Sequence, residues 1–446
     1  MKTTLLTETH PTLSGTLVRA LLRIEGEPPA DARRVPLNLA LVLDRSGSMG
    51  YGKLEAVKEA ARGLIRRLHP EDVVSVVAFD DQVVTVAHPG TARDQTALVN
   101  ALMAIQSGST TNLSGGWLQG RALLQEHFDP EGVNRVILLT DGLANQGITD
   151  GATLARLTAQ ARTEGVTTTT VGVGDGFNED LLMAMADAGG GSSYYIERLD
   201  QAGGIFEEEV AGLLSIAAQN LTVTVRPREA ASVSAVYNQY PSHETPDHAL
   251  VLSVGDLYAR EPREVLADFL VEGVTVASSS SGAGGAASVD EGSAEAGGDG
   301  MAGPAGAPVA DLVLEADTWT DAGSMERQRI TLPITFDPRA GAVSHAEVER
   351  VFVLLKAARA RREAVERGDR GDVRGAARSL RDAANLLMAT APNDLTVREE
   401  IQDLGRVAQS LEEQDIMDAA DRKYMASKAA HYSRSRRSAG GRTTRE

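Results

Sequence analysis

The sequence predicts an α/β protein with a doubly wound, mostly parallel sheet, followed by an antiparallel β-sandwich module and a C-terminal helical bundle. In residues 36–218, short apolar β-branched runs alternate with amphipathic segments, which is typical of parallel strands covered by helices on both faces. In residues 219–340, apolar and polar residues alternate with period two, as in antiparallel strands. In residues 341–432, apolar residues recur at helical spacing.

Three shorter segments complete the predicted order. Residues 1–35 contain an alternating run from Thr16 to Ile24, so we expect this N-terminal β segment to pack with the β module. The stretch 278–308 lacks Lys and Arg and is rich in Ser, Gly and Ala, so we expect a disordered loop between two strands. Residues 433–446 form a basic flexible tail, and we interpret the whole basic stretch from Arg422 to Glu446 mainly as frayed and solvated.

Composition excludes several classes of function. The chain has 44 basic and 62 acidic side chains, a formal charge of −18 that opposes the attraction to phosphate on which nucleic-acid binding depends. It has no cysteine, which rules out disulfides, thiolate zinc sites and cysteine nucleophiles. The first 15 residues have no apolar core of signal-peptide length, and no run approaches the roughly 18 apolar residues of a membrane span. We therefore expect a soluble, cytoplasmic protein that does not bind nucleic acid.

One motif supplies side chains that could bind a metal ion. The apolar run LVLDRSGSMG ends in Asp44, with Ser46 and Ser48 following at alternate positions before a glycine and an amphipathic segment. A carboxylate and two hydroxyls on one turn are hard oxygen ligands that suit Mg²⁺, Mn²⁺ or Ca²⁺. Taken alone, the same residues would also suit the N-terminus of a helix, where Asp and Ser accept hydrogen bonds from free backbone N–H groups.

Two later loops supply more oxygens. Thr111 lies in GSTTNLSGG, and Asp141 directly follows the apolar run VILLT. Loops that follow parallel strands meet at one edge of the sheet, so both can reach the first motif. In order and in loop context, these residues resemble the metal-ion-dependent adhesion site of von Willebrand factor A domains. Asp44, Ser46 and Ser48 match its first motif, Thr111 its threonine and Asp141 its final aspartate.

The resemblance covers residues 36–218 and includes the glycine-rich turn from Ala188 to Gly191. It implies a Rossmann-like fold and a site in which the serines and the threonine bind Mg²⁺ directly, while the aspartates often act through water; Mn²⁺ or Ca²⁺ are possible alternatives. Thr110 is a competing position, but the following Asn112-Leu113 favours Thr111. The resemblance also implies that the last helix, near Gly204 to Ala218, shifts when a ligand binds.

In this family an Asp or Glu of a protein partner completes the metal site, so the resemblance implies a metal-dependent adaptor or scaffold and not an enzyme. The order of segments also resembles that of a bacterial group labelled calcium-activated chloride-channel-like. Without a spanning segment, only the binding domain of that group is expected here, and no channel. A second reading is a regulatory subunit or cochaperone of an ATP-driven, AAA-type complex, which would use the same metal chemistry.

Catalytic interpretations are less favoured. The sequence VGVGDG at 171–176 has its third glycine one place early for a dinucleotide loop, and no P-loop motif occurs. His243 and His248 are a close pair in a stretch that we expect to be an exposed loop. Asp80 and Asp81 are adjacent and are interpreted as a solvated turn, since neighbouring side chains usually point apart. In residues 357–394 a packed helical hairpin is favoured over a tetratricopeptide-like repeat, because no second copy is visible.

Overall fold

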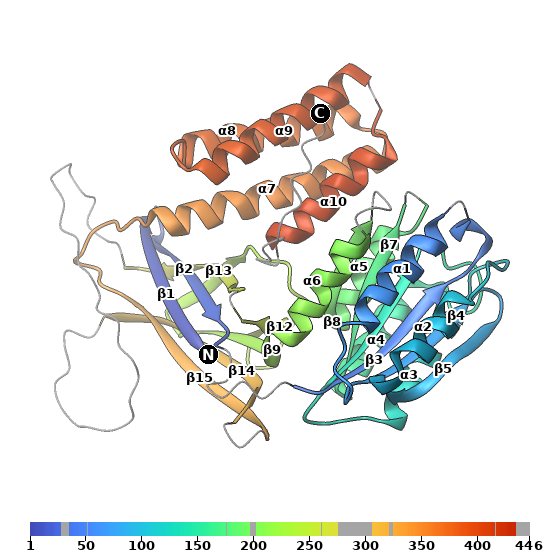
Figure 1. Ribbon diagram of the computed structural model, residues 1–446. Helices are drawn as coiled ribbons and strands as arrows, with labels where there is room; N and C mark the ends of the chain where they lie inside the picture. Colours follow the sequence, from blue (N-terminus) through green and yellow to red (C-terminus); the bar gives the residue numbers. More distant parts are fainter. Residues whose placement is uncertain are drawn as a thin grey trace.

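The computed structural model describes residues 1–27, 35–50, 52–174, 176–196, 202–259, 261–274, 306–320, 324–414 and 416–433. It has three units, an α/β unit, a β-sandwich and a helical unit (Figure 1), and the predicted fold class is confirmed. Most of the predicted loop at 278–308 lies outside the described residues, but Ala307 and Pro308 already belong to a strand. Residues 434–446 of the predicted tail also lie outside them.

The α/β unit is built on a six-stranded sheet of order β5-β4-β3-β6-β7-β8, in which only β5 pairs antiparallel to its neighbour. Every residue of β3, β6 and β7 is buried, which explains why these strands are almost continuously apolar or β-branched. The strands are β3 (Leu37–Asp44), β4 (Val73–Phe79), β5 (Val83–Thr91), β6 (Val133–Thr140), β7 (Val166–Val173) and β8 (Gly190–Ile196).

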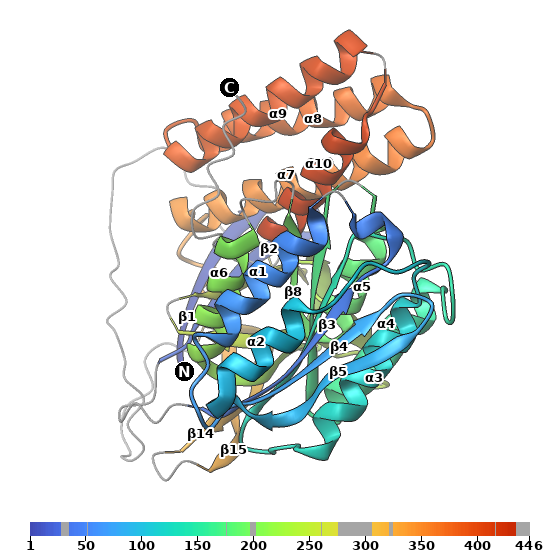
Figure 2. The same cartoon turned by 45° about the vertical axis from the view of Figure 1, so that its right-hand side comes forward.

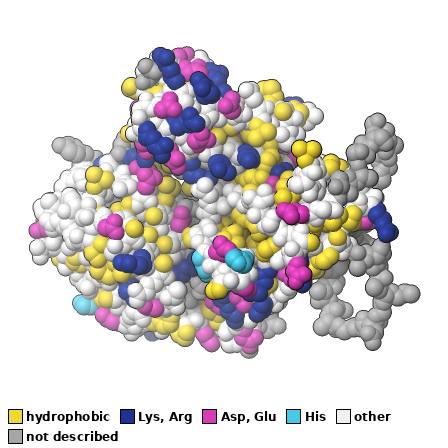
Figure 3. Space-filling model, turned by 180° about the vertical axis from the view of Figure 1, so that it is seen from behind, with side chains coloured by type: hydrophobic (Ala, Val, Ile, Leu, Met, Phe, Trp, Pro, Cys, Tyr) yellow, Lys and Arg dark blue, Asp and Glu magenta, His cyan; other side chains and the backbone are white. Residues whose placement is uncertain are grey.

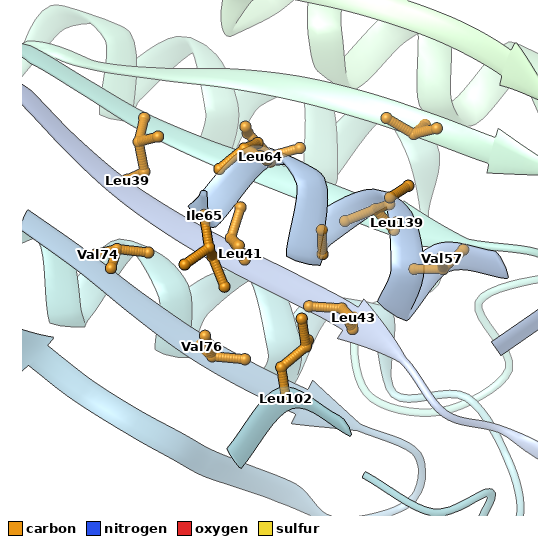
Figure 4. Close-up of a cluster of buried hydrophobic side chains, with 14 of the residues drawn as sticks. Leu39, Leu41, Leu43, Val57, Leu64, Ile65, Val74, Val76, Leu102 and Leu139 are labelled. Atoms are coloured by element: carbon orange, nitrogen blue, oxygen red, sulfur yellow. The ribbon is translucent and has the colours of Figure 1, made fainter. Parts of the chain in front are cut away.

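Helices cover both faces of this sheet. On one face Leu41 and Leu43 of β3 pack against Leu64 and other residues of α1 (Figure 4), whereas Ala40 and Val42 point to the opposite face and pack near α3. The first face carries α1 (Lys53–Ile65), α2 (Gln95–Met103) and α6 (Ala202–Leu214), and the second carries α3 (Leu113–Glu126), α4 (Gly151–Thr163) and α5 (Glu179–Ala188). Two short 3-10 helices, Gly47–Met49 and Ala92–Asp94, lie in the connecting loops.

The sandwich consists of two antiparallel sheets of order β1-β2-β13-β10 and β11-β12-β9-β14-β15. Strand β2 pairs with β13, with Ala20 opposite Ala267, so the N-terminal segment is part of the sandwich and the α/β unit is inserted between β2 and β9. The strands are β1 (Lys2–Pro11), β2 (Gly15–Glu25), β9 (Ile216–Pro227), β10 (Ala231–Val236), β11 (Ser242–Glu244), β12 (Leu250–Tyr258), β13 (Arg263–Glu272), β14 (Ala307–Trp319) and β15 (Met325–Phe336).

The helix expected up to Ala218 is shorter in the structure, so this part of the prediction is wrong. Helix α6 ends at Leu214, and β9 already begins at Ile216. The reason is pairing with β12, in which Ile216 lies opposite Tyr258 and Ala218 opposite Leu257. An apolar stretch satisfies the helical and the strand pattern equally well, and only the partner strand decides between them.

The helical unit contains α7 (Ala346–Asp369), α8 (Val373–Thr390), α9 (Leu395–Gln414) and α10 (Ala419–Ser433). Figures 1 and 2 show α7 over the sandwich and α10 beside the α/β unit. Helices α7 and α8 pack as a hairpin, α9 packs on α8, and α10 packs on α7. None of the helices in the described ranges is long and apolar enough to cross a membrane.

Up to Ser433, the interpretation of the basic stretch from Arg422 onward as a frayed tail is wrong. Helix α10 runs through it, and three of its cations have defined partners. Arg422 binds carboxylates of α5 and α7, and Lys428 pairs with Glu400 and Asp403. Lys423 is only 5% exposed, and its Nζ lies 4.3 Å from the centre of the Phe177 ring. The sequence did not reveal these contacts because the partners lie on other helices, far away along the chain.

Candidate metal centre

The ends of two neighbouring parallel strands place the two aspartates at one edge of the sheet. Asp44 is the last residue of β3, and Asp141 directly follows β6, which pairs with β3 up to Leu43 and Leu139. After Asp44 the chain turns at once, since the Ser46 backbone N–H donates to Asp44 Oδ1 at 2.7 Å. This turn carries Ser48 back over the strand ends.

The side-chain oxygens of all five predicted residues converge there. Ser46 Oγ lies 3.0 Å from Ser48 Oγ, and Ser48 Oγ donates to Asp141 Oδ1 at 2.7 Å. A Cβ atom added to Gly142 would lie 3.1 Å from Thr111 Oγ1 and 3.6 Å from both Asp44 Oδ2 and Ser48 Oγ. The absence of a side chain at position 142 thus leaves a small space lined by three of the predicted ligands.

These residues fit a hard divalent cation. Neighbouring ligands of an octahedral Mg²⁺, each about 2.1 Å from the ion, are about 3 Å apart, close to the oxygen separations in this cluster. The donors are two carboxylates and three hydroxyls, with neither nitrogen nor sulfur. Across the described ranges, no group of three or more His, Cys, Asp or Glu side chains could hold a metal.

The electrostatics of the cluster also favour a cation. Asp44 is fully buried, and burial raises its pKa to about 6. The negative charge of Asp141 acts in the same direction, while hydrogen bonds from Thr140 and Ser46 oppose the rise. The charged form of Asp44 is therefore costly in this environment, and a positive charge beside it would relieve that cost.

Two residues outside the predicted set complete the cluster. Lys53, the first residue of α1, donates to Asp141 Oδ2 at 2.6 Å, and Thr140 Oγ1 donates to Asp44 Oδ2 at 2.5 Å. Both could have been found in the sequence: Thr140 precedes Asp141, and side chains at the start of a helix lean toward its N-terminus, where the motif lies.

Asp80 has a structural role that the sequence did not reveal, and its interpretation as part of a solvated turn is wrong. It is 4% exposed and accepts a hydrogen bond from Arg45 Nη2 at 2.9 Å and a longer one from the Ser109 N–H at 3.3 Å. A Cβ on Gly108 would lie only 1.7 Å from Asp80 Oδ2, so the loop passes very close to this carboxylate. Asp80 thereby joins the first motif to the loop that carries Thr111, whereas Asp81 is exposed.

The geometry separates Thr111 from Thr110. Thr111 is 3% exposed, faces the space at Gly142, and its backbone N–H donates to Asn145 Oδ1 at 2.9 Å. Thr110 is exposed, and its hydroxyl accepts a hydrogen bond from Gln146 at 2.7 Å. Of the two, only Thr111 belongs to the oxygen cluster.

The other candidates lie elsewhere. His243 and His248 are exposed, and His248 Nδ1 lies 2.8 Å from Glu244 Oε1. At the end of β7, Gly174 has a φ of 69° in the turn that leaves the sheet. The next residue, Asp175, lies outside the described residues.

Comparisons with known proteins agree with the fold. Residues 38–208 match the family model of the von Willebrand factor type A domain. An uncharacterised protein of Synechocystis is 38% identical over 185 residues, covering 41% of this chain and 43% of that protein. The chain spans less than half the length of the first curated relatives that it matches.

Two solved structures resemble all three units of the chain. A von Willebrand factor type A protein from Catenulispora acidiphila has a TM-score of 0.68 at 17% identity, with 96% of each chain covered. The ArnB paralog VWA2 from Sulfolobus acidocaldarius has a TM-score of 0.56 at 16% identity, with 97% of each chain covered. At these identities the likeness concerns the fold alone. Together, the family match, the sheet order and the strand-end loops identify residues 38–208 of this chain as a von Willebrand factor type A domain.

Proposed function

We propose that the chain is a metal-dependent adaptor or scaffold whose type A domain holds Mg²⁺ and binds an Asp or Glu of a partner protein. The observation that carries the proposal is the convergence of two carboxylates and three hydroxyls around Gly142. Three of the five ligands are neutral, so a bound cation would keep much of its positive charge and attract a further carboxylate. The five ligands are Asp44, Ser46, Ser48, Thr111 and Asp141, and Mn²⁺ or Ca²⁺ would suit the same oxygens.

The surface around the cluster suits a protein ligand. Asp44 and Asp141 are buried, but Ser48 is exposed, so the cluster opens to solvent on the side of this hydroxyl. Leu143, one residue beyond Gly142, is 55% exposed and offers apolar contact area beside the opening. A carboxylate carried on a protein surface can reach such a rim without entering a deep pocket.

The proposal assigns binding, and no turnover, to the chain. Two further charged groups at this edge of the sheet form ion pairs within the domain: Asp80 pairs with Arg45, and Lys53 pairs with Asp141. The sandwich and the helical unit would orient the domain, since a buried ion pair joins the sandwich to it and the partly exposed ion pairs of Arg422 join the helical unit to it. We also propose a cytoplasmic location, which suits a chain without cysteine. Membership of the bacterial chloride-channel-like group remains a prediction from the order of segments.

A pull-down from native lysate tests the proposal, using the full chain, Asp44→Ala and the control Asp81→Ala, each in Mg²⁺ and in EDTA. Asp81 is a carboxylate at the same edge, but it is exposed and lies outside the oxygen cluster. We expect a protein that is retained by the wild type and Asp81→Ala with Mg²⁺ only. An ATPase among the retained proteins would favour the second reading, a subunit of an ATP-driven complex. Equal recovery in all conditions would overturn the proposal and move function to the sandwich or the helices.

A further inference from the structure

Lys53 contacts the oxygen cluster, although it is not one of the five proposed metal ligands. Its Nζ lies 2.6 Å from Asp141 Oδ2, while the other oxygen of the same carboxylate accepts from Ser48. The Asp141 side chain is 0% exposed and the Lys53 side chain 27% exposed, so the ammonium approaches the carboxylate from the solvent side.

The fold holds this ammonium in place. Gly52 has a φ of 90°, a conformation that glycine adopts readily, and starts α1 at Lys53. Side chains in the first turn lean toward the N-terminus of the helix, and the loop that carries Ser46 and Ser48 lies on that side. On the other side, a Cβ on Gly174 would lie 3.1 Å from Lys53 Cε and 3.3 Å from Nζ, so the absence of a side chain there leaves room for the lysine.

We propose that Lys53 is a built-in counter-cation that competes with the divalent ion for Asp141. It would thereby set the Mg²⁺ concentration at which the cluster holds the ion and can bind the carboxylate of a partner protein. The inference rests on the proposed function. Asp44 and Asp141 place two carboxylates in the cluster, and Lys53 balances the charge of the second. A divalent cation near Asp141 repels the ammonium, which is partly exposed and can move into solvent. Lys53 thus weakens metal binding while stabilising the domain at low Mg²⁺.

Calorimetric titration of the full chain with MgCl₂, and separately with MnCl₂, tests the inference. The variants are Lys53→Met, the charge-preserving Lys53→Arg and the control Arg62→Met. Arg62 lies on the same helix, nine residues and therefore about 13 Å further along its axis. We expect Lys53→Met to bind Mg²⁺ on the order of tenfold more tightly than the wild type, and Lys53→Arg and Arg62→Met to stay close to it.

Thermal unfolding in EDTA supplies a second readout. Lys53→Met should unfold at a lower temperature than the wild type, because Asp141 loses its ion partner, and saturating MgCl₂ should raise its Tm by more than it raises that of the wild type. Lys53→Gln replaces Lys53→Met if the latter does not fold. Equal or weaker Mg²⁺ binding by the neutral variant, with normal binding by the wild type, overturns the inference alone. A wild-type chain that binds neither ion overturns the proposed function as well.

Discussion

Arg135 of β6 and Asp256 of β12 form an ion pair whose side chains are 0% and 2% exposed, and this pair joins the type A domain to the sandwich. The same guanidinium donates to Glu209 of α6 at 3.0 Å and to the hydroxyl of Tyr258 at 3.2 Å. Burial opposes the charge of Arg135, but Tyr258, Glu209 and Asp256 outweigh it and raise its pKa well above the usual value. The two units are therefore held together by a buried charged network at which β6, α6 and β12 meet.

Arg135→Met should lower the free energy of unfolding by about 3–5 kcal/mol, because Glu209 and Asp256 would keep buried negative charges without a cation. Chemical denaturation of the full chain measures this loss. Arg93→Met is the matched control, since Arg93 pairs with Glu71 at the surface, where the side chains are 66% and 64% exposed. Its loss should stay below about 1 kcal/mol. Equal losses in both variants would show that the buried network does not hold the units together.

The fold class could be predicted from the sequence because burial on both faces requires nearly continuous apolar strands, as in β3 and β7. The role of Arg135 could not be predicted in this way. Its acidic partners lie 74 and 121 residues away along the chain, so no local pattern points to them. A charged residue within an apolar run is the one available signal, and it identifies neither partner.

In the candidate site, too, some features could be predicted from the sequence and others could not. The convergence of its five oxygen-bearing residues could be predicted, because they resemble the adhesion site in order and each lies at the end of a strand or the start of a helix; that they bind a metal stays a prediction. Asp80 and Arg422 were misjudged, because charge alone does not distinguish a solvated side chain from one whose partner comes from another loop or unit. Asp80 meets Arg45 of the neighbouring loop, and Arg422 meets Asp180 in the type A domain.

Arg422→Ala should loosen the helical unit from the type A domain. Arg422 pairs with Glu179 and Asp180 at the start of α5 and with Asp369 at the end of α7, so its loss leaves three carboxylates close together without their shared cation. We expect amide hydrogen exchange in α10 to become about 5- to 30-fold faster, which corresponds to about 1–2 kcal/mol.

The control for this variant is Arg378→Ala. Arg378 is an exposed residue of α8. Figure 3 shows that basic and acidic side chains are interspersed on the helical unit, at the top of that view. This substitution should leave exchange in α10 unchanged. Unaltered exchange in Arg422→Ala would mean that apolar packing alone docks the helical unit.

Asp403→Asn should destabilise the helical unit in a pH-dependent manner. Burial alone would raise the pKa of Asp403, but the charge of Arg361 and the contacts with Lys428 and Arg406 lower it far below the usual value. A carboxyl group whose pKa is lower in the folded than in the unfolded state stabilises the fold fully above its unfolded pKa, near 4, and this contribution declines below that value and is lost as the pH falls through the folded pKa. The variant should therefore lose on the order of 2–3 kcal/mol at pH 7, and this loss should be smaller by about 1 kcal/mol at pH 3, where the folded carboxyl is still ionised.

Urea denaturation at pH 7, 5 and 3 measures the difference between the wild type and Asp403→Asn. Asp382→Asn, at an exposed carboxylate of α8, should change stability little at any of these pH values. A loss in Asp403→Asn that is the same at all three values would mean that the hydrogen bonds of Asp403 matter and its charge does not.

Gly142→Ala should impair metal binding without altering any ligand. The new methyl group would lie 3.1 Å from Thr111 Oγ1 and 3.6 Å from Asp44 Oδ2, inside the space that the ligands line. Because Gly142 is not in the left-handed region, alanine can adopt its backbone conformation, and we expect stability to change by less than about 1 kcal/mol. Calorimetric titration with MgCl₂ should show at least about a tenfold loss of affinity, since small displacements of ligands are costly for an ion that demands regular geometry. Gly63→Ala, in an open position on α1, should bind Mg²⁺ like the wild type. Normal Mg²⁺ binding by Gly142→Ala would place the ion away from these oxygens and would count against the assigned cluster.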